Sequence, residues 1–218
     1  WPVAEPRQGP RGARSRPADA AWPPDVGDAW VFAYGSLMWN PCFPFEECRR
    51  ALLRGWHRAL CILSILNRGT VERPGLALGL DRGGSCVGFA FRIGSTELAA
   101  AREALWRREM INGVYIPRIT PVVLKGGDRV PALVFTARPG HPQYVPNLAP
   151  EQAASLVAQG VGSYGMAIDY LRNVVRHLDE FNIADCPLRA LLRLAEAVAV
   201  SEAGTEGKRW PNQDARRC

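Results

Sequence analysis

The chain has 218 residues, 47% of them hydrophobic and 22% charged, which suits one globular domain and argues against two large ones. Its net charge of +6 could suggest a nucleic-acid partner, but the basic residues are spread along the whole chain, so we expect none. No stretch approaches the ~20 apolar residues of a membrane-spanning helix, and the N-terminus has no apolar signal core. We therefore expect a cytoplasmic protein without membrane association.

Residues 1–27 combine Pro, Gly, Arg and Ala without an apolar period, which predicts a flexible arm. From there the sequence changes to short runs rich in β-branched and aromatic residues, bounded by turn residues. The predicted strands are WVFAY (30–34), LLRGWHRALCILSIL (52–66), LALGL (76–80), CVGFAFRI (86–93), VYIPRITPVVL (114–124) and VPALVFTA (130–137). The linkers DRGGS (81–85) and KGGD (125–128) predict hairpin turns, because glycine tolerates the positive φ of such turns. Pro117 and Pro121 place part of the fifth strand at an edge or bulge.

One helix interrupts the strands, with Ser95 as its expected N-cap and LAAAREALWRREM (98–110) as its body. Three further helical stretches follow the last strand: 149–160, 163–181 and 186–200, with Asp185 as a candidate cap for the last. Residues 202–218 are expected to form a flexible tail. The prediction is therefore an α+β fold in a single domain over residues 28–201, with a mostly antiparallel β core, one inserted helix and a helical C-terminal third.

The segment AYGSLMWNP (33–41) follows the first predicted strand directly, and the strand breaks at Gly35 and Ser36. Glycine there permits a tight turn and leaves room for a ligand beside the main chain. Successive backbone N–H groups of such a turn can bind a carboxylate or a developing oxyanion. A glycine turn after a strand is common, and this one lacks the GxSxG spacing of a nucleophile elbow. By itself the segment is therefore also compatible with a purely structural turn.

Four residues of the inserted helix share one stripe at 100° per residue: Leu98, Ala101, Leu105 and Glu109. A carboxylate thus ends an apolar stripe, whereas Glu103 and Arg107 point to the opposite, solvated side. Burial of Glu109 would raise its pKa and make it a better base near neutrality. The alternatives are a structural ion pair with an arginine such as Arg118, or a side chain that turns outward at the helix end.

Two further patterns weigh against metal or nucleotide chemistry. The six cysteines contain no CxxC pair and the three histidines show no HExxH or zinc-finger spacing, so no metal site is expected. Cys61 and Cys86 lie in apolar runs, which is typical of reduced, buried thiols rather than of a disulfide framework. The GxGxxG pattern of residues 160–165 follows a helical stretch instead of a strand, which favours a helix-to-helix loop over a dinucleotide site.

WVFAYGSLMWNP (30–41) is similar to the opening motif W-V-F-x-Y-G-S-L-[IM]-W of the ChaC-like, glutathione-specific γ-glutamylcyclotransferases. NRGTVERPGLALGL (67–80) and GGSCVGFAFRI (83–93) resemble the two strands that follow in that family. LWRREMINGVYIPR (105–118) resembles the segment with the family's catalytic Glu, and the matching residue is Glu109. The resemblance covers about two thirds of the chain. In one departure, this chain has Asn-Gly-Val-Tyr at residues 112–115 where the family has Gly-Gly-Tyr, which concerns loop shape and substrate fit.

The resemblance implies a small cyclotransferase-type β-barrel and an enzyme that cleaves glutathione to 5-oxoproline and cysteinylglycine, with no metal, cofactor or obligate protein partner. It implies Glu109 as general base. The implied substrate-binding residues are Tyr34, Gly35, Ser36, Leu37, Arg68 and Tyr144. Tyr34 and Tyr144 are candidate hydrogen-bond donors, and Arg68 is either a partner of a substrate carboxylate or a turn residue.

Two rival interpretations stay open. The same fold and base could serve other γ-glutamyl amines or peptides, since the rim of the pocket decides that preference. The chain could instead be a non-catalytic binding or regulatory module. An inward Glu109 argues against the second rival, because a buried carboxylate is costly for a protein that makes no use of it.

Overall fold

The computed structural model describes residues 27–206, and side chains are described as far as Ser201. The predicted arm lies outside the described residues except for its last residue. Of the predicted tail, only the backbone of residues 202–206 is described, and it continues the last helix.

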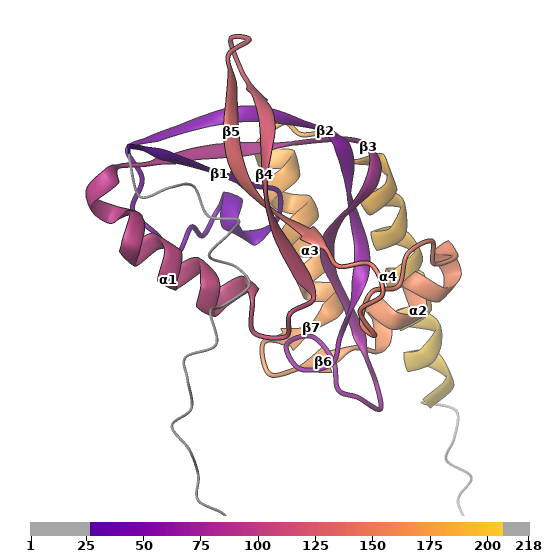
Figure 1. Cartoon of the computed structure of the whole chain (residues 1–218). Helices are drawn as coiled ribbons and strands as arrows, with labels where there is room; N and C mark the ends of the chain where they lie inside the picture. Colours follow the sequence, from indigo (N-terminus) through magenta and orange to yellow (C-terminus); the bar gives the residue numbers. More distant parts are fainter. Residues whose placement is uncertain (1–26, 207–218) are drawn as a thin grey trace, which may run out of the picture.

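Five strands form a closed barrel (Figure 1). They are β1 (Ala29–Ala33), β2 (Glu47–Ser64), β3 (Gly75–Ile93), β4 (Tyr115–Leu124) and β5 (Arg129–Ala137). Their order around the barrel is β1-β3-β2-β4-β5, and every pairing is antiparallel except that of β1 with β5, which closes the barrel. The predicted mostly antiparallel barrel core is therefore confirmed.

The two glycine-rich linkers behave differently. Gly126 and Gly127, with φ of 117° and 102°, form the predicted hairpin turn between β4 and β5. The predicted turn at residues 81–85 is wrong, because this segment lies inside the continuous strand β3. Its glycines Gly83 and Gly84 have positive φ near a register shift opposite Gly55 of β2. A pair of glycines can form a β-bulge within a strand as well as a hairpin turn. Here the hydrogen-bonded pairing of β3 with β2 continues on both sides of the irregularity.

The two prolines of β4 lie at a partly unpaired edge, as predicted. β4 pairs with β5 over its whole length, but with β2 only through Val122–Leu124. Pro117 and Pro121 therefore lie where the second neighbour is missing, and their lack of an N–H costs no ladder bond on that side.

The helices are α1 (Leu98–Glu109), between β3 and β4, and α2 (Pro150–Gln159), α3 (Ala167–Glu180) and α4 (Cys186–Glu206) after β5. Ser95 is not the N-cap of α1. It begins a separate 3₁₀ turn, Ser95–Glu97, and the α-helix starts only at Leu98. Between α2 and α3 the chain makes the expected loop, which contains a short hairpin of β6 (Val161–Gly162) and β7 (Gly165–Met166). Helices α2, α3 and α4 pack against one another, and α2 and α3 contact β3 (Figure 1).

The orientation of α1 follows the predicted stripe. Leu98, Ala101 and Leu105 are at most 3% exposed and join the core that fills the barrel. On the opposite face the side chains of Glu103 and Arg107 are 71% and 74% exposed. This orientation points the last residue of the stripe toward the barrel. In the described part of the chain, no helix is both long enough and apolar enough to cross a membrane.

Candidate active site

One cavity brings together the two features that the sequence singled out. It is lined by Glu109 from the end of α1 and by all four residues of the predicted turn, Tyr34, Gly35, Ser36 and Leu37, which we call the cradle. Glu109 and the cradle are more than 70 residues apart in sequence and meet because α1 packs its apolar stripe onto the barrel. Aromatic and aliphatic side chains complete the walls: Phe32, Leu78, Tyr115, Phe135 and Tyr170.

The Glu109 carboxylate is largely withdrawn from solvent, with 16% of its side chain exposed. Burial raises its pKa above the ordinary value, and the Arg108 guanidinium, whose Nε lies 3.4 Å from Glu109 Oε1, opposes this rise. The net pKa is raised, so the carboxylate is a stronger proton acceptor than an exposed one. Arg118, the alternative partner considered from the sequence, instead donates a hydrogen bond to Thr136 Oγ1.

Arg108 also connects the general-base candidate to the cradle. Its Nη2 donates to Ser36 Oγ at 2.8 Å, and its Nη1 donates to the carbonyl oxygen of Asn40 at 2.8 Å. The same guanidinium therefore contacts Glu109 and the turn on the opposite wall. This fixes the separation of the carboxylate and the cradle.

The cradle presents free backbone donors. After β1 ends at Ala33, Ser36–Met38 form a single 3₁₀ turn in which the Met38 N–H donates to the Gly35 carbonyl at 2.9 Å. Within residues 27–206, no group accepts a hydrogen bond from the N–H groups of Gly35, Ser36 or Leu37. Donors without a protein partner at the wall of a cavity are suited to bind a carboxylate or an oxyanion.

Three of the chain's five tyrosines line the cavity. Burial raises the pKa of Tyr34 and Tyr115 well above the ordinary value and that of Tyr170 to about 12, so all three hydroxyls keep their protons and can donate. The Tyr115 hydroxyl donates to the Leu78 carbonyl at 2.6 Å. Tyr115 and Tyr170 were missed from the sequence. The position of Tyr115 six residues after Glu109 was a usable signal, whereas Tyr170 looked like an ordinary position of a helix.

The two remaining predicted site residues lie apart from this cavity. Arg68 donates to the Tyr164 carbonyl, and its guanidinium carbon lies 5.1 Å from the centre of the Tyr170 ring. It lines an open groove on α3 that shares only Tyr170 with the cavity. The Tyr144 hydroxyl donates to Asp81 Oδ1 at 2.6 Å and does not line the cavity.

A second cavity meets the first at Glu109 and Tyr115, which line both. It lies between the end of β2 and the connection from α1 to β4. Its apolar residues include Leu66 and Ile111, which are 55% and 68% exposed. Three side-chain amides add hydrogen-bonding capacity: Asn67, Asn112 and Gln143. Glu109 therefore stands between the aromatic cavity and a second cavity that is about equally enclosed.

The chain is similar to known proteins in both sequence and fold. The family model described as "ChaC-like protein" matches residues 29–198. The glutathione-specific γ-glutamylcyclotransferase of Escherichia coli K12 is 39% identical over 180 residues, which cover 83% of this chain and 78% of that protein. The enzyme of the same name from Schizosaccharomyces pombe is 32% identical over 70% of this chain and 85% of its own length. A crystal structure of a yeast γ-glutamyl cyclotransferase specific to glutathione shares the fold, with a TM-score of 0.72 at 19% identity over 78% of this chain and 96% of that one.

Proposed function

This chain belongs to the ChaC-like protein family, and from that premise we propose that it is a γ-glutamylcyclotransferase that cleaves glutathione to 5-oxoproline and cysteinylglycine. The observation that carries the proposal is that the largely buried Glu109 carboxylate and the cradle, whose N–H groups have no protein acceptor, line one cavity. The proposal assigns both the base and the anion-binding donors of this lyase reaction to that one site.

The substrate supplies its own nucleophile. The α-amine of the γ-glutamyl group attacks its γ-carbonyl carbon, a five-membered lactam forms, and the bond to the cysteine nitrogen breaks. Because amine and carbonyl belong to one molecule, little entropy is lost in bringing them together. Glu109 takes the proton that the amine loses and returns it to the leaving nitrogen, so that no net proton is consumed.

The cradle deals with the negative charge. The N–H groups of Gly35, Ser36 and Leu37 hold either the substrate carboxylate or the oxyanion that develops on the γ-carbonyl oxygen. Tyr34, which lines the same wall and keeps its proton, adds a hydroxyl donor. Where the substrate fills the cavity between the aromatic walls, such donors act with little competition from water.

The position of Glu109 between the two cavities orients the substrate. The γ-glutamyl group lies with the cradle in the aromatic cavity, and the scissile nitrogen must lie next to Glu109. The cysteinylglycine part then continues into the second cavity, because that is where Glu109 has its other open side. Arg68 can contact a substrate group only in the groove on the other side of Tyr170. The Tyr144 hydroxyl can donate to the substrate only if its hydrogen bond to Asp81 breaks.

We place the reaction in the cytoplasm, because the described chain carries free thiols, two of them exposed at Cys48 and Cys186. The deciding assay incubates the purified protein with glutathione in EDTA and measures 5-oxoproline. The wild-type protein should form it, and Glu109→Gln should form it at least about 100-fold more slowly. No product from the wild type would refute the proposed activity. If γ-glutamyl dipeptides yield 5-oxoproline and glutathione does not, the protein is a cyclotransferase for other γ-glutamyl substrates. If neither glutathione nor the dipeptides yield it, the result favours a non-catalytic binding module.

A further inference from the structure

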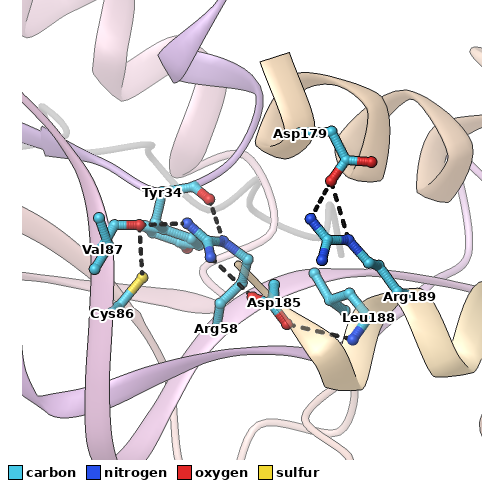
Figure 2. Close-up of polar contacts among 8 residues, drawn as sticks. All are labelled: Tyr34, Arg58, Cys86, Val87, Asp179, Asp185, Leu188 and Arg189. Carbon is cyan, nitrogen blue, oxygen red and sulfur yellow. Dashed lines mark hydrogen bonds and ion pairs between the residues drawn. The ribbon is translucent and has the colours of Figure 1, made fainter. Parts of the chain in front are cut away.

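A buried arginine lies behind the cradle. Arg58 of β2 has only 3% of its side chain exposed, and its guanidinium donates in three directions. Nε donates to the Tyr34 carbonyl at 2.6 Å, Nη2 to the Val87 carbonyl at 2.8 Å, and Nη1 to Asp185 Oδ2 at 2.9 Å (Figure 2). Arg58 does not line the substrate cavity, so it touches the cradle from outside.

Asp185 divides its carboxylate between two tasks. Oδ2 receives the Arg58 hydrogen bond, while Oδ1 accepts from the Leu188 N–H at 3.3 Å and so caps the first turn of α4 (Figure 2). Its side chain is 12% exposed. The predicted cap of the last helix is thus confirmed, and it also supplies the counter-charge that a buried guanidinium requires.

The bond to the Tyr34 carbonyl fixes the first donor of the cradle. Tyr34 and Gly35 share one planar peptide unit, and in the trans form the C=O and N–H of such a unit point in opposite directions. With the carbonyl held on Arg58, the Gly35 N–H points away from Arg58, toward the cavity side. If this peptide rotated, a carbonyl oxygen would face the substrate's negative charge instead.

The charge on Arg58 strengthens the same donor. A hydrogen bond from a charged group to a carbonyl is about twice as strong as a neutral one, and it polarises the peptide that accepts it. The Gly35 N–H becomes a better donor as a result. Stability alone is a weak reason for such a buried pair, because apolar replacements are often as stable or more so.

We propose that Arg58, held in place by Asp185, is a positioning residue that aims the cradle's N–H groups at the substrate. The inference rests on the proposed cyclotransferase function, since it assumes that these donors bind the substrate carboxylate or the oxyanion. By this inference Asp185, at the start of α4, has an indirect part in the reaction, although it lies far along the sequence from the cradle.

The test replaces Arg58 by lysine. Arg58→Lys keeps a positive charge opposite Asp185, but a flexible ammonium group cannot reproduce the planar fork that serves three acceptors. Loss of one oxyanion donor costs about 10²–10³ in kcat, so misalignment should lower kcat/KM for glutathione by about 10- to 100-fold. If the cradle holds the oxyanion, the substitution should lower kcat. If the cradle holds the substrate carboxylate, the substitution should raise KM instead.

Two readouts separate positioning from a merely structural role. Activity is measured at temperatures where each variant is fully folded by circular dichroism, so that the fraction unfolded cannot explain a loss. The acidic limb of the pH profile should stay at the wild-type position, because the charged group that acts on the Glu109 pKa is Arg108, not Arg58. Asp185→Asn, which can still cap α4 but lacks the counter-charge, should show a smaller loss in the same direction.

A neighbouring ion pair provides the control. Arg189 of α4 pairs with Asp179 at the surface, and its side chain is 39% exposed (Figure 2). Arg189→Gln should stay within about twofold of wild-type activity. A folded Arg58→Lys with unchanged kcat/KM would overturn the inference, and if that variant does not fold, a fully active Asp185→Asn would do so. An inactive wild type would refute the proposed function, and the inference falls with it.

Discussion

Replacing Glu109 by glutamine removes the proton acceptor while leaving the size of the side chain almost unchanged. General acid–base catalysis contributes about 10²–10⁴-fold to a rate, or about 3–5 kcal/mol of the activation barrier. Because the cradle and the aromatic walls are untouched, we expect kcat to fall by this factor while KM changes little. The residual rate reflects the tethered amine and the cradle donors.

The same substitution should stabilise the fold at neutral pH. Burial raises the pKa of Glu109 in the folded protein above its unfolded value, despite the opposing charge of Arg108. The folded state then binds the proton more tightly, so stability declines as pH rises from the unfolded pKa through the folded pKa, and stays lowered above it. Glutamine has no such cost. The midpoint of thermal unfolding should therefore be higher than that of the wild type at pH 8, and the two should converge in acid.

Release of 5-oxoproline and thermal unfolding across pH measure both effects. Glu103→Gln is the matched control on the same helix, because the Glu103 side chain is 71% exposed. Its ion pair with Arg107 is weak, since 4.0 Å separates Glu103 Oε1 from Arg107 Nη2. This control should change neither quantity. A Glu109→Gln variant that keeps more than about a tenth of the wild-type kcat would refute the base assignment. So would an equal loss in both variants.

Three further changes test the surroundings of the base. Arg108→Gln should move the acidic limb of the kcat/KM profile to higher pH, because its guanidinium lowers the pKa of Glu109; an unmoved limb contradicts this coupling. Leu66→Glu, at the second cavity, should raise KM for glutathione more than for a γ-glutamyl amide of a small amine, and equal effects would place cysteinylglycine elsewhere. Leu105→Ala, fully buried on α1, should lower the unfolding free energy by about 2–5 kcal/mol in urea titration, and a loss below about 1 kcal/mol would contradict its packing role.

The sequence could predict the strands of an antiparallel β core because strand propensity and turn residues are local properties, whereas the closed barrel was expected only from the family resemblance. The sequence could not tell the glycine pair at residues 83–84 from the pair at 126–127. Both have positive φ, yet one lies within a strand and the other makes a turn. The difference comes from β2, which continues to pair with β3 on both sides of the irregularity. That pairing joins residues some 26 positions apart in sequence, as between Trp56 and Arg82, and no local pattern contains it.

The site divides in the same way. Glu109 could be found because helical periodicity places it on a stripe with apolar neighbours, and the cradle because a strand breaks at Gly35. Tyr170 could not, because only the packing of α3 brings it to the barrel. Arg58 stood in the strand-forming run 52–66 without any mark of a special role. Its importance depends on Asp185, which is 127 residues away in sequence.

The cradle is too short to hold its own orientation. Its 3₁₀ turn spans three residues and has no side-chain cap, and its backbone hydrogen bonds run only from Met38 to the Gly35 carbonyl and from Trp39 and Asn40 to the Ser36 carbonyl. Its geometry must therefore come from outside, and two arginines supply it. Arg108 holds the Ser36 hydroxyl on the side of the base, while Arg58 holds the Tyr34 carbonyl from behind. In the proposed mechanism the substrate contributes the nucleophile, so the protein has to keep one base and a few donors correctly placed, and we infer that these two contacts do so.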